Sequence, residues 1–155
     1  MKRIAVCLLT VVMILTLTGC GGGKAKEIDL NALAGDLTAS AAFTVDMTQY
    51  TTPDGVAAGI YRYEAADVES AVLYYSGSTG EEIFLAKAKD SAAADRLEQA
   101  CKDRVTSQQA SLENYVPEAI VRLQNAVSVK EANYVILVVA DDAAAARSIV
   151  DGYLK

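Results

Sequence analysis

Three thiols, two pairs of adjacent carboxylates and eight tyrosines are the side chains of this chain that could carry chemistry. Histidine is absent from all 155 residues. This absence excludes Ser-His-Asp and Cys-His nucleophilic catalysis, histidine-ligated zinc and histidine acid-base catalysis. We therefore predict no catalytic residue, no metal site and no cofactor from the sequence.

The most informative thiol is that of Cys20, because it follows a segment with the character of a secretory signal. Lys2 and Arg3 give this segment a positive start, and residues 4–17 form an apolar run that only two threonines interrupt. A positive start, an apolar core and small residues at the exit are typical of a signal peptide. The run is also shorter than the roughly 20 apolar residues that a bilayer-spanning helix needs.

Residues 17–20, with the sequence Leu-Thr-Gly-Cys, resemble the lipobox of bacterial lipoproteins. The resemblance implies a thioether-linked lipid on Cys20, carrying fatty acids such as palmitate, and cleavage of the chain after Gly19. Three glycines follow, and a glycine-rich segment behaves as a flexible coil, so residues 20–27 are predicted to be a tether. The alternative is an uncleaved N-terminal membrane helix with a chance cysteine; the coincidence of signal, box and glycines favours the lipid anchor.

Residues 20–155 are expected to form the exported part of the chain. Their 136 residues suit one domain. Loss of Lys2 and Arg3, and of no acidic residue, changes the formal net charge from −6 to −8. An acidic chain is unsuited to nucleic acid and to anionic lipid, so the acyl chains have to hold the domain on the extracytoplasmic face of the cell membrane. Cys101 is then the only free thiol and has no disulfide partner.

Hydrophobic periodicity predicts a single α+β domain over residues 28–155. Alternating apolar residues indicate two hairpins, whose strands are residues 69–75, 82–89, 126–130 and 134–140. The strand around residues 135–139 is apolar on both faces, which suits a central strand covered on both sides or by a partner. Residues 43–47 are predicted to be extended, residues 51–55 to form a turn, and residues 57–63 to be a short strand or an irregular extended stretch.

Apolar stripes and capping residues predict the helices. The first begins after Asp29, and the longest runs from Asp90 or Ser91 to about Tyr115. A short helix opens at Pro117 and runs to about residue 124, and a last helix follows residues 141–142. The order is thus one helix followed by two strand-strand-helix units, which predicts an antiparallel sheet with long helices packed on one face.

The order of motifs is similar to that of a known family. After the lipobox and the first strand pair, the long helix ends in Asn-Tyr-Val-Pro-Glu at residues 114–118, and Asn-Tyr-Val-Ile-Leu-Val follows at residues 133–138. Residues 28–154 thus resemble the domain-of-unknown-function family numbered 4358, found in lipoproteins of Gram-positive bacteria of the clostridial kind. The resemblance implies a location and a fold, and it brings no activity, ligand or catalytic residue.

Each reactive candidate also has a structural explanation. Cys101 shares the apolar stripe of the long helix, which favours a buried core thiol over a reactive one. The pair at residues 141–142 is expected to cap a helix, since no spacing typical of calcium ligands surrounds it. The pair at residues 81–82 is expected to be a solvated loop end, in preference to a catalytic pair.

Two adjacent tyrosines, Tyr74 and Tyr75, form the candidate interaction surface. Neighbouring residues on a strand point to opposite faces, so only one of these two is core if the sheet is covered on a single face. The other would lie on an open face, where tyrosine is favoured in interfaces. The alternative is that both are partly buried and have satisfied hydroxyls.

We therefore predict a lipid-anchored extracytoplasmic protein whose domain is a non-catalytic binding module for an envelope protein or glycan. Two alternatives stay open. One is a small cell-envelope enzyme using Asp/Glu or Tyr chemistry, which clustered carboxylates of raised pKa in a cleft would favour. The other is a structural spacer without a ligand.

Overall fold

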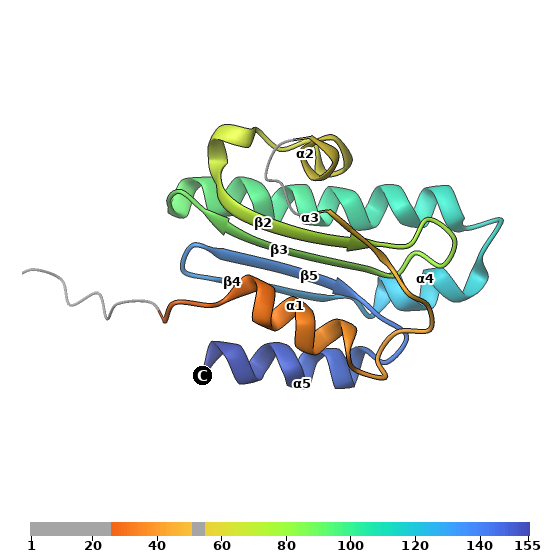
Figure 1. The fold of residues 1–155 in the computed structure, drawn as a ribbon. Coiled ribbons are helices and arrows are strands. Elements are labelled where there is room, and N and C mark those ends of the chain that lie inside the picture. Colours follow the sequence, from red (N-terminus) through yellow and green to blue (C-terminus); the bar gives the residue numbers. More distant parts are fainter. Residues whose placement is uncertain (1–25, 51–54) are drawn as a thin grey trace, which may run out of the picture.

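A five-stranded antiparallel sheet forms the centre of the computed structural model, which describes residues 26–50 and 55–155. Its strands are β1 (Thr48–Tyr50), β2 (Val68–Tyr75), β3 (Glu82–Ala88), β4 (Val127–Glu131) and β5 (Tyr134–Val139). Their spatial order is β1-β2-β3-β5-β4, so the two hairpins meet where β3 pairs with β5 (Figure 1). The predicted α+β class and both predicted hairpins are confirmed. β1 follows the predicted extended segment at residues 43–47.

Five α-helices accompany the sheet in the described part of the chain. They are α1 (Leu30–Thr38), α2 (Val56–Tyr61), α3 (Ser91–Leu112), α4 (Pro117–Gln124) and α5 (Ala143–Leu154), and a short 3-10 helix, η1 (Ala65–Asp67), precedes β2. Asp29, Asp90 and Asp142 cap α1, α3 and α5 by accepting hydrogen bonds from backbone N–H groups of the first turn. These caps confirm the predicted helix starts.

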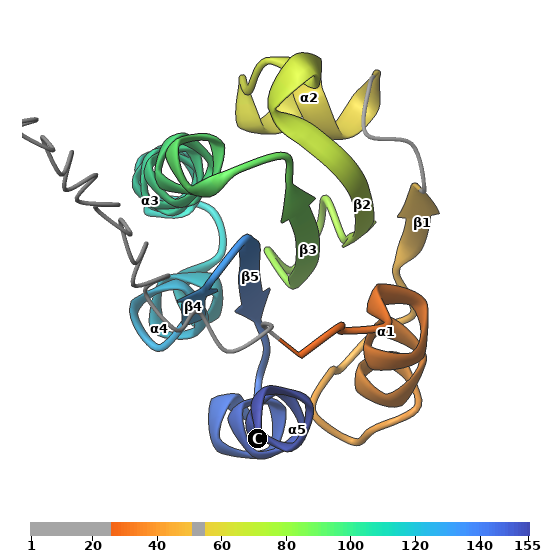
Figure 2. The same ribbon diagram turned by 90° about the vertical axis from the view of Figure 1, so that its left-hand side faces the viewer.

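Helices cover both faces of the sheet, which differs from the predicted packing on one face (Figure 2). α2 and α3 lie on one face and α1 and α5 on the other; we call these the α3 face and the α1 face. The reason is that β2, β3 and β5 carry apolar residues at both odd and even positions, so apolar side chains point to both faces of the sheet. Across these strands Leu73, Phe84 and Leu137 are neighbours on the α3 face, while Val72 and its neighbours fill the α1 face.

Residues 57–63 differ most from prediction, because they begin with the helix α2 where a strand or an extended stretch was expected. Ala57 and Tyr61 lie one helical turn apart and are both buried in the core of the α3 face. Arg62 then ends the helix in the left-handed conformation, with φ 56°. Most of the predicted turn at residues 51–55 lies outside the described residues. α3 ends at Leu112, three residues before the predicted end.

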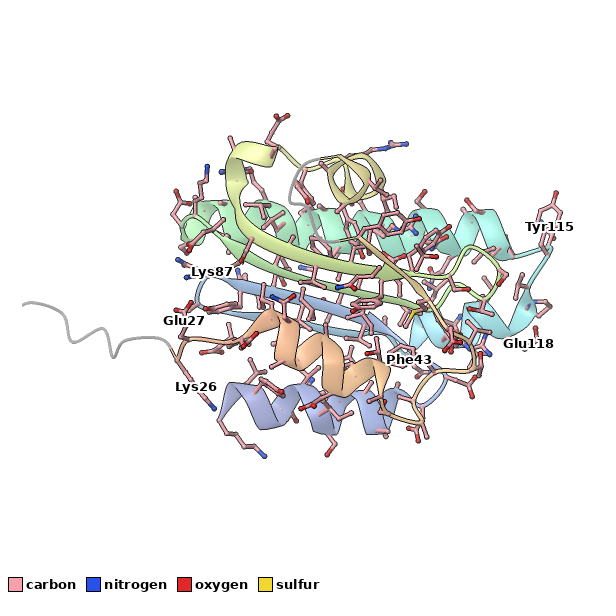
Figure 3. The ribbon with its side chains drawn as sticks, in the orientation of Figure 1. Lys26, Glu27, Phe43, Lys87, Tyr115 and Glu118 are labelled. Atoms are coloured by element: carbon pink, nitrogen blue, oxygen red, sulfur yellow. The ribbon has the colours of Figure 1, made fainter. Side chains whose placement is uncertain are left out.

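The two ends of the domain have different contents. Lys26 and Glu27 lie at one end, which we call the N-terminal end, and Tyr115 and Glu118 lie at the other, the α4 end (Figure 3). At the N-terminal end the Lys26 ammonium donates to the carbonyl of Lys155 at 2.5 Å. The C-terminus of α5 is therefore held beside the start of the described chain.

Candidate functional site

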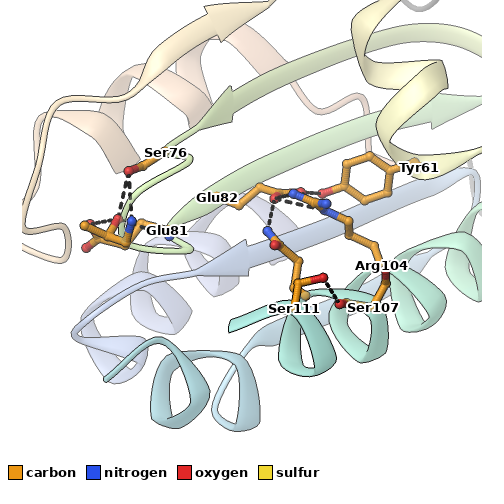
Figure 4. A network of polar contacts seen from close by, with 9 residues as sticks. Tyr61, Ser76, Glu81, Glu82, Arg104, Ser107 and Ser111 are labelled. Atoms are coloured by element: carbon orange, nitrogen blue, oxygen red, sulfur yellow. Dashed lines mark hydrogen bonds and ion pairs between the residues drawn. The ribbon is translucent and has the colours of Figure 1, made fainter. Parts of the chain in front are cut away.

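Glu81 directly precedes β3 and Glu82 is its first residue, and both are buried, with exposed fractions of 0% and 1% (Figure 4). The expectation of a solvated loop end is therefore wrong. Adjacent residues of an extended chain point to opposite sides, so each carboxylate enters a different polar network. Burying an unpaired charge would be costly, and the fold provides partners for both carboxylates.

The Glu82 carboxylate lies on the α3 face and accepts hydrogen bonds from three side chains. The Tyr61 hydroxyl donates to Oε1. The guanidinium of Arg104 forms an ion pair with Oε2, with Nη2 at 2.6 Å and Nε at 3.1 Å. Nε2 of Gln108 adds a contact to Oε2 at 3.3 Å. One carboxylate thus joins α2 and α3 to the sheet.

Charge states in this network are fixed by burial and by proximity. Burial first, and then the negative charge of Glu82, raises the pKa of the Tyr61 hydroxyl well above its usual value, so Tyr61 stays a donor. Burial acts to lower the pKa of Arg104, but the bonds to Glu82 outweigh it and the pKa is raised. The guanidinium also lies 5.9 Å and 5.3 Å from the ring centroids of Tyr61 and Tyr75.

This arrangement limits the chemistry of Glu82. A general base needs a lone pair within hydrogen-bond reach of the substrate proton. Both oxygens of Glu82 already accept from donors of the chain itself, and the residue is 1% exposed. The network therefore positions helices, and it presents no free acceptor to a ligand.

Glu81 organises the loops at the α4 end. Its carboxylate accepts from the backbone N–H and the hydroxyl of Thr44, at 2.7 Å and 2.8 Å, and from the hydroxyl of Thr79 at 2.9 Å. The Thr79 hydroxyl also lies 2.9 Å from Oγ of Ser76. The segment before β1 and the loop between β2 and β3 are thus joined through one buried carboxylate.

Arg122 extends these connections to α4. Its guanidinium pairs with Asp141 at 2.9 Å and donates to the carbonyl of Thr79 at 3.2 Å. The backbone N–H groups of Asp141 and Asp142 both donate to the carbonyl of Ala42, at 3.0 Å and 3.1 Å. Loops that are distant in sequence are therefore held in fixed positions at this end.

Gly80 brings the β2–β3 loop close to α3 and α4, and only glycine suits its place. Its φ is +73°, and a Cβ atom there would lie 3.1 Å from Leu112 Cδ1 and 3.2 Å from the Cβ of Ala119. We expect Gly80→Ala to lower the free energy of unfolding by about 1–2 kcal/mol through backbone strain. Gly35→Ala, in α1 with nothing within 4 Å, is expected to raise it by about 0.5–1 kcal/mol. Urea denaturation measures both, and equal signs would contradict the strain.

A groove of about 650 Å³ runs between α4 and the connection from β5 to α5. Its first wall is formed by Glu118, Val121 and Arg122 of α4 and by the C-cap residue Asn125, and its second wall is residues 140–143. Val121 is 59% exposed beside the groove, and Tyr115, at the same end of the domain, is 82% exposed. We call this groove the α4 groove.

Tyr74 and Tyr75 point to opposite faces, as expected, and both are half-buried. Tyr75 packs against the core of the α3 face, with Arg104 over its ring. Tyr74 packs against the core of the α1 face, and β1 lies beside it through the pairing with Gln49. Because helices cover both faces, neither ring lies on an open sheet. A binding role for these two tyrosines stays a prediction.

Cys101 is a free, buried thiol with an exposed fraction of 0%, which confirms the expected core position. Burial raises the pKa of the thiol, and the negative charges of Glu82 and Glu98 act in the same direction. A reactive thiol needs a lowered pKa and an accessible sulfur. The position of Cys101 provides neither.

The raised pKa of Cys101 predicts a pH dependence of stability. A group with a higher pKa in the folded state stabilises the fold below its unfolded pKa, about 8.5 for a thiol, and this contribution is lost as the pH rises. Between about pH 8.5 and about pH 9.5 we expect the thiol to reduce the free energy of unfolding by about 1 kcal/mol. Denaturation at both pH values measures this loss. Cys101→Ala should show a slope smaller by that amount, and an unchanged slope would contradict the assignment.

The acidic pair at residues 141–142 has two separate roles. Asp142 caps α5 by accepting from the N–H of Ala145 at 2.9 Å, as predicted, whereas Asp141 pairs with Arg122. Within residues 26–50 and 55–155, His, Cys, Asp and Glu side chains form no group of three or more that could hold a metal ion. No helix in those same ranges has the length and apolar character needed to cross a membrane.

The predicted lipid site at Cys20 and the predicted cleavage after Gly19 lie outside the described residues. They stay predictions from the sequence.

Comparison with known proteins gives one relationship. A search of curated proteins and a search of solved structures each found no match. The family model described as "Domain of unknown function (DUF4358)" matches residues 40–140, which hold all five strands, α2 to α4, and the networks of Glu81 and Glu82. The match confirms the family indicated by the motifs at residues 114–118 and 133–138, over a shorter segment than the expected residues 28–154. The chain therefore belongs to the DUF4358 family.

Proposed function

We propose that this protein is a lipoprotein anchored to the extracytoplasmic face of the cell membrane, whose domain is a non-catalytic module that binds an envelope partner. The signal-like segment before Cys20 supports the location, and the lipobox supports the anchor. Two or more acyl chains on Cys20 would suffice for stable anchoring without a membrane-spanning helix.

The observation that carries the binding role is that the start of the described chain and the α4 groove lie at opposite ends of the domain. The described chain starts at Lys26, at the end opposite to Tyr115 and Glu118 (Figure 3). Six residue steps from Cys20 to Lys26 span at most about 20 Å, so a lipid on Cys20 keeps the N-terminal end near the membrane. The 22-residue helix α3 is roughly 33 Å long and runs toward the α4 end. The α4 groove then faces away from the membrane, where a partner can reach it.

The enzyme alternative has less support from the geometry. Carboxylate or tyrosine chemistry needs such a group free to meet a substrate. Glu81 and Glu82 are the buried carboxylates among the described residues, and donors of the chain itself, such as Thr44 and Tyr61, already occupy them. A binding role explains the exposed groove and does not require either residue to react.

Mass spectrometry of the N-terminus from the native host tests the proposal. We expect the chain to begin at Cys20 with a diacylglyceryl thioether and to sediment with membranes. Cys20→Ala should stay unprocessed and lose the lipid mass. An unmodified Cys20 in the native chain would overturn the anchor and the orientation that follows from it.

A further inference from the structure

The α4 groove has a shape suited to a short extended segment of another protein. Glu118, Val121 and Arg122 are three and four residues apart, so they form one face of α4, and the C-cap residue Asn125 continues it. This eight-residue helix is about 12 Å long, which matches three to four residues of extended chain. Arg122 and the bonds to Ala42 hold both walls in place. The groove is therefore formed before a ligand arrives.

The charge of the groove favours a basic ligand. Its lining contains the carboxylates of Glu118, Asp141 and Asp142 and a single cation, Arg122, which Asp141 already neutralises. The N-termini of α4 and α5 also lie at the groove and contribute about half a positive charge each. Together these charges leave the groove with about one negative charge. Glu118 and Asp142 are the exposed carboxylates that could pair with an incoming cation.

An aliphatic contact accompanies this charge. Val121 lies on the same face of α4 as Glu118 and is 59% exposed, so its side chain offers apolar surface that the fold leaves uncovered. Burial of such a side chain against a partner is favourable, while the surrounding carboxylates select against an acidic partner. The negative charge and the exposed valine together restrict the partner more than the charge alone would.

We infer that the α4 groove binds a segment of a partner protein in which a lysine or arginine stands beside an aliphatic side chain. The cation lies between Glu118 and Asp142, and the aliphatic side chain covers Val121. This inference rests on the proposed binding function and names the kind of partner. A second copy of the chain is the competing occupant, and the test below distinguishes it.

Fluorescence anisotropy with the purified full chain in neutral detergent tests the inference. The probe is a fluorescein-labelled peptide of twelve residues, with four lysines, four valines and four serines interspersed. The double variant Glu118→Gln/Asp142→Asn removes both carboxylates, and asparagine still caps α5. We expect its dissociation constant to be about fivefold to tenfold weaker than that of the native chain. Val121→Lys is expected to weaken binding at least as much, through loss of apolar contact and through repulsion.

The matched control is Glu64→Gln/Glu113→Gln, which removes the same charge from exposed residues outside the groove. It should leave the dissociation constant within about twofold, since neither side chain lines the groove. Equal weakening in the control, or equal binding of a peptide with glutamate in place of lysine, would overturn the inference. Absence of binding at millimolar peptide would do so too.

Sedimentation of the same variants tests whether a second copy of the chain occupies the groove. A dimer of the native chain that Val121→Lys dissociates would assign the groove to a second copy and overturn the peptide assignment. The N-terminal mass is an independent readout. A lipidated Cys20 with unaltered peptide binding in the groove variants would remove this inference alone, whereas an unmodified Cys20 would remove the proposed anchor.

Discussion

Arg104→Met is expected to lower the free energy of unfolding by about 3–5 kcal/mol, because it leaves a buried carboxylate without its cation. Glu82 is 1% exposed, and Arg104 supplies both the ion pair and three of its hydrogen bonds. The side chain of Arg104 is itself only 14% exposed, so little solvent screening weakens the pair. Guanidinium denaturation at neutral pH measures the loss.

The double variant Arg104→Met/Glu82→Leu serves as the control. Replacing a buried ion pair with apolar residues of similar size is often close to neutral, whereas removing one partner is costly. We expect the double variant to recover at least half of the stability that Arg104→Met loses. The remaining deficit comes from the Tyr61 hydroxyl and the Gln108 amide, which lose their acceptor. A double variant less stable than the single one would contradict the uncompensated charge as the cause.

Phe84→Ala is expected to cost about 3–5 kcal/mol, the usual range for truncating a buried aromatic residue. Phe84 is fully buried in the middle of β3, and its ring stacks on Tyr61 with centroids 4.0 Å apart and planes at 22°. Tyr63 adds a tilted contact at 5.9 Å. The ring thus fixes the aromatic residue that donates to Glu82. Thermal and guanidinium unfolding should both report the loss.

Val121→Ala is a suitable comparison for Phe84→Ala, because Val121 is 59% exposed. We expect its effect to stay within about 0.5 kcal/mol, as is usual for surface substitutions. Near-equal losses of unfolding free energy in the two variants would contradict the buried position of Phe84 in the core. A loss below about 1.5 kcal/mol for Phe84→Ala would contradict it as well.

Much of the fold could be predicted from local patterns. The alternation of apolar residues in Ala71, Leu73 and Tyr75 assigned β2 and its two faces, and Asp90 and Pro117 marked the starts of α3 and α4. These signals are local because a strand alternates every residue and a cap acts within one helical turn. They needed no knowledge of the rest of the chain.

The networks of Glu81 and Glu82 could not be predicted in this way. The partners of Glu82 lie 21 to 26 positions away in α2 and α3, and those of Glu81 include Thr44, 37 positions away. One weak signal existed: Arg104 stands beside the apolar stripe of α3 that contains Cys101, where a charge is unexpected. A charged residue at such a place needs a buried counter-ion.

The formation of α2 also depended on distant residues. Its six residues include a glycine and show no clear helical period in the sequence, yet Ala57 and Tyr61 pack into the core of the α3 face. Packing overrides weak local preference when a short segment has a suitable surface to contact. Packing also explains why helices cover both faces of the sheet. Apolar side chains point to both faces, and each face has to be covered.

The sequence by itself determined the family, the strand pairs and the starts of α1, α3, α4 and α5, and it predicts the lipid anchor at Cys20. Each of these depends on residues that are neighbours along the chain. Only the tertiary structure decided that Glu81 and Glu82 are buried and that α4 meets the start of α5 to form a groove. Those outcomes depend on contacts between segments far apart in sequence, whose free energies become visible once the sheet has brought the segments together.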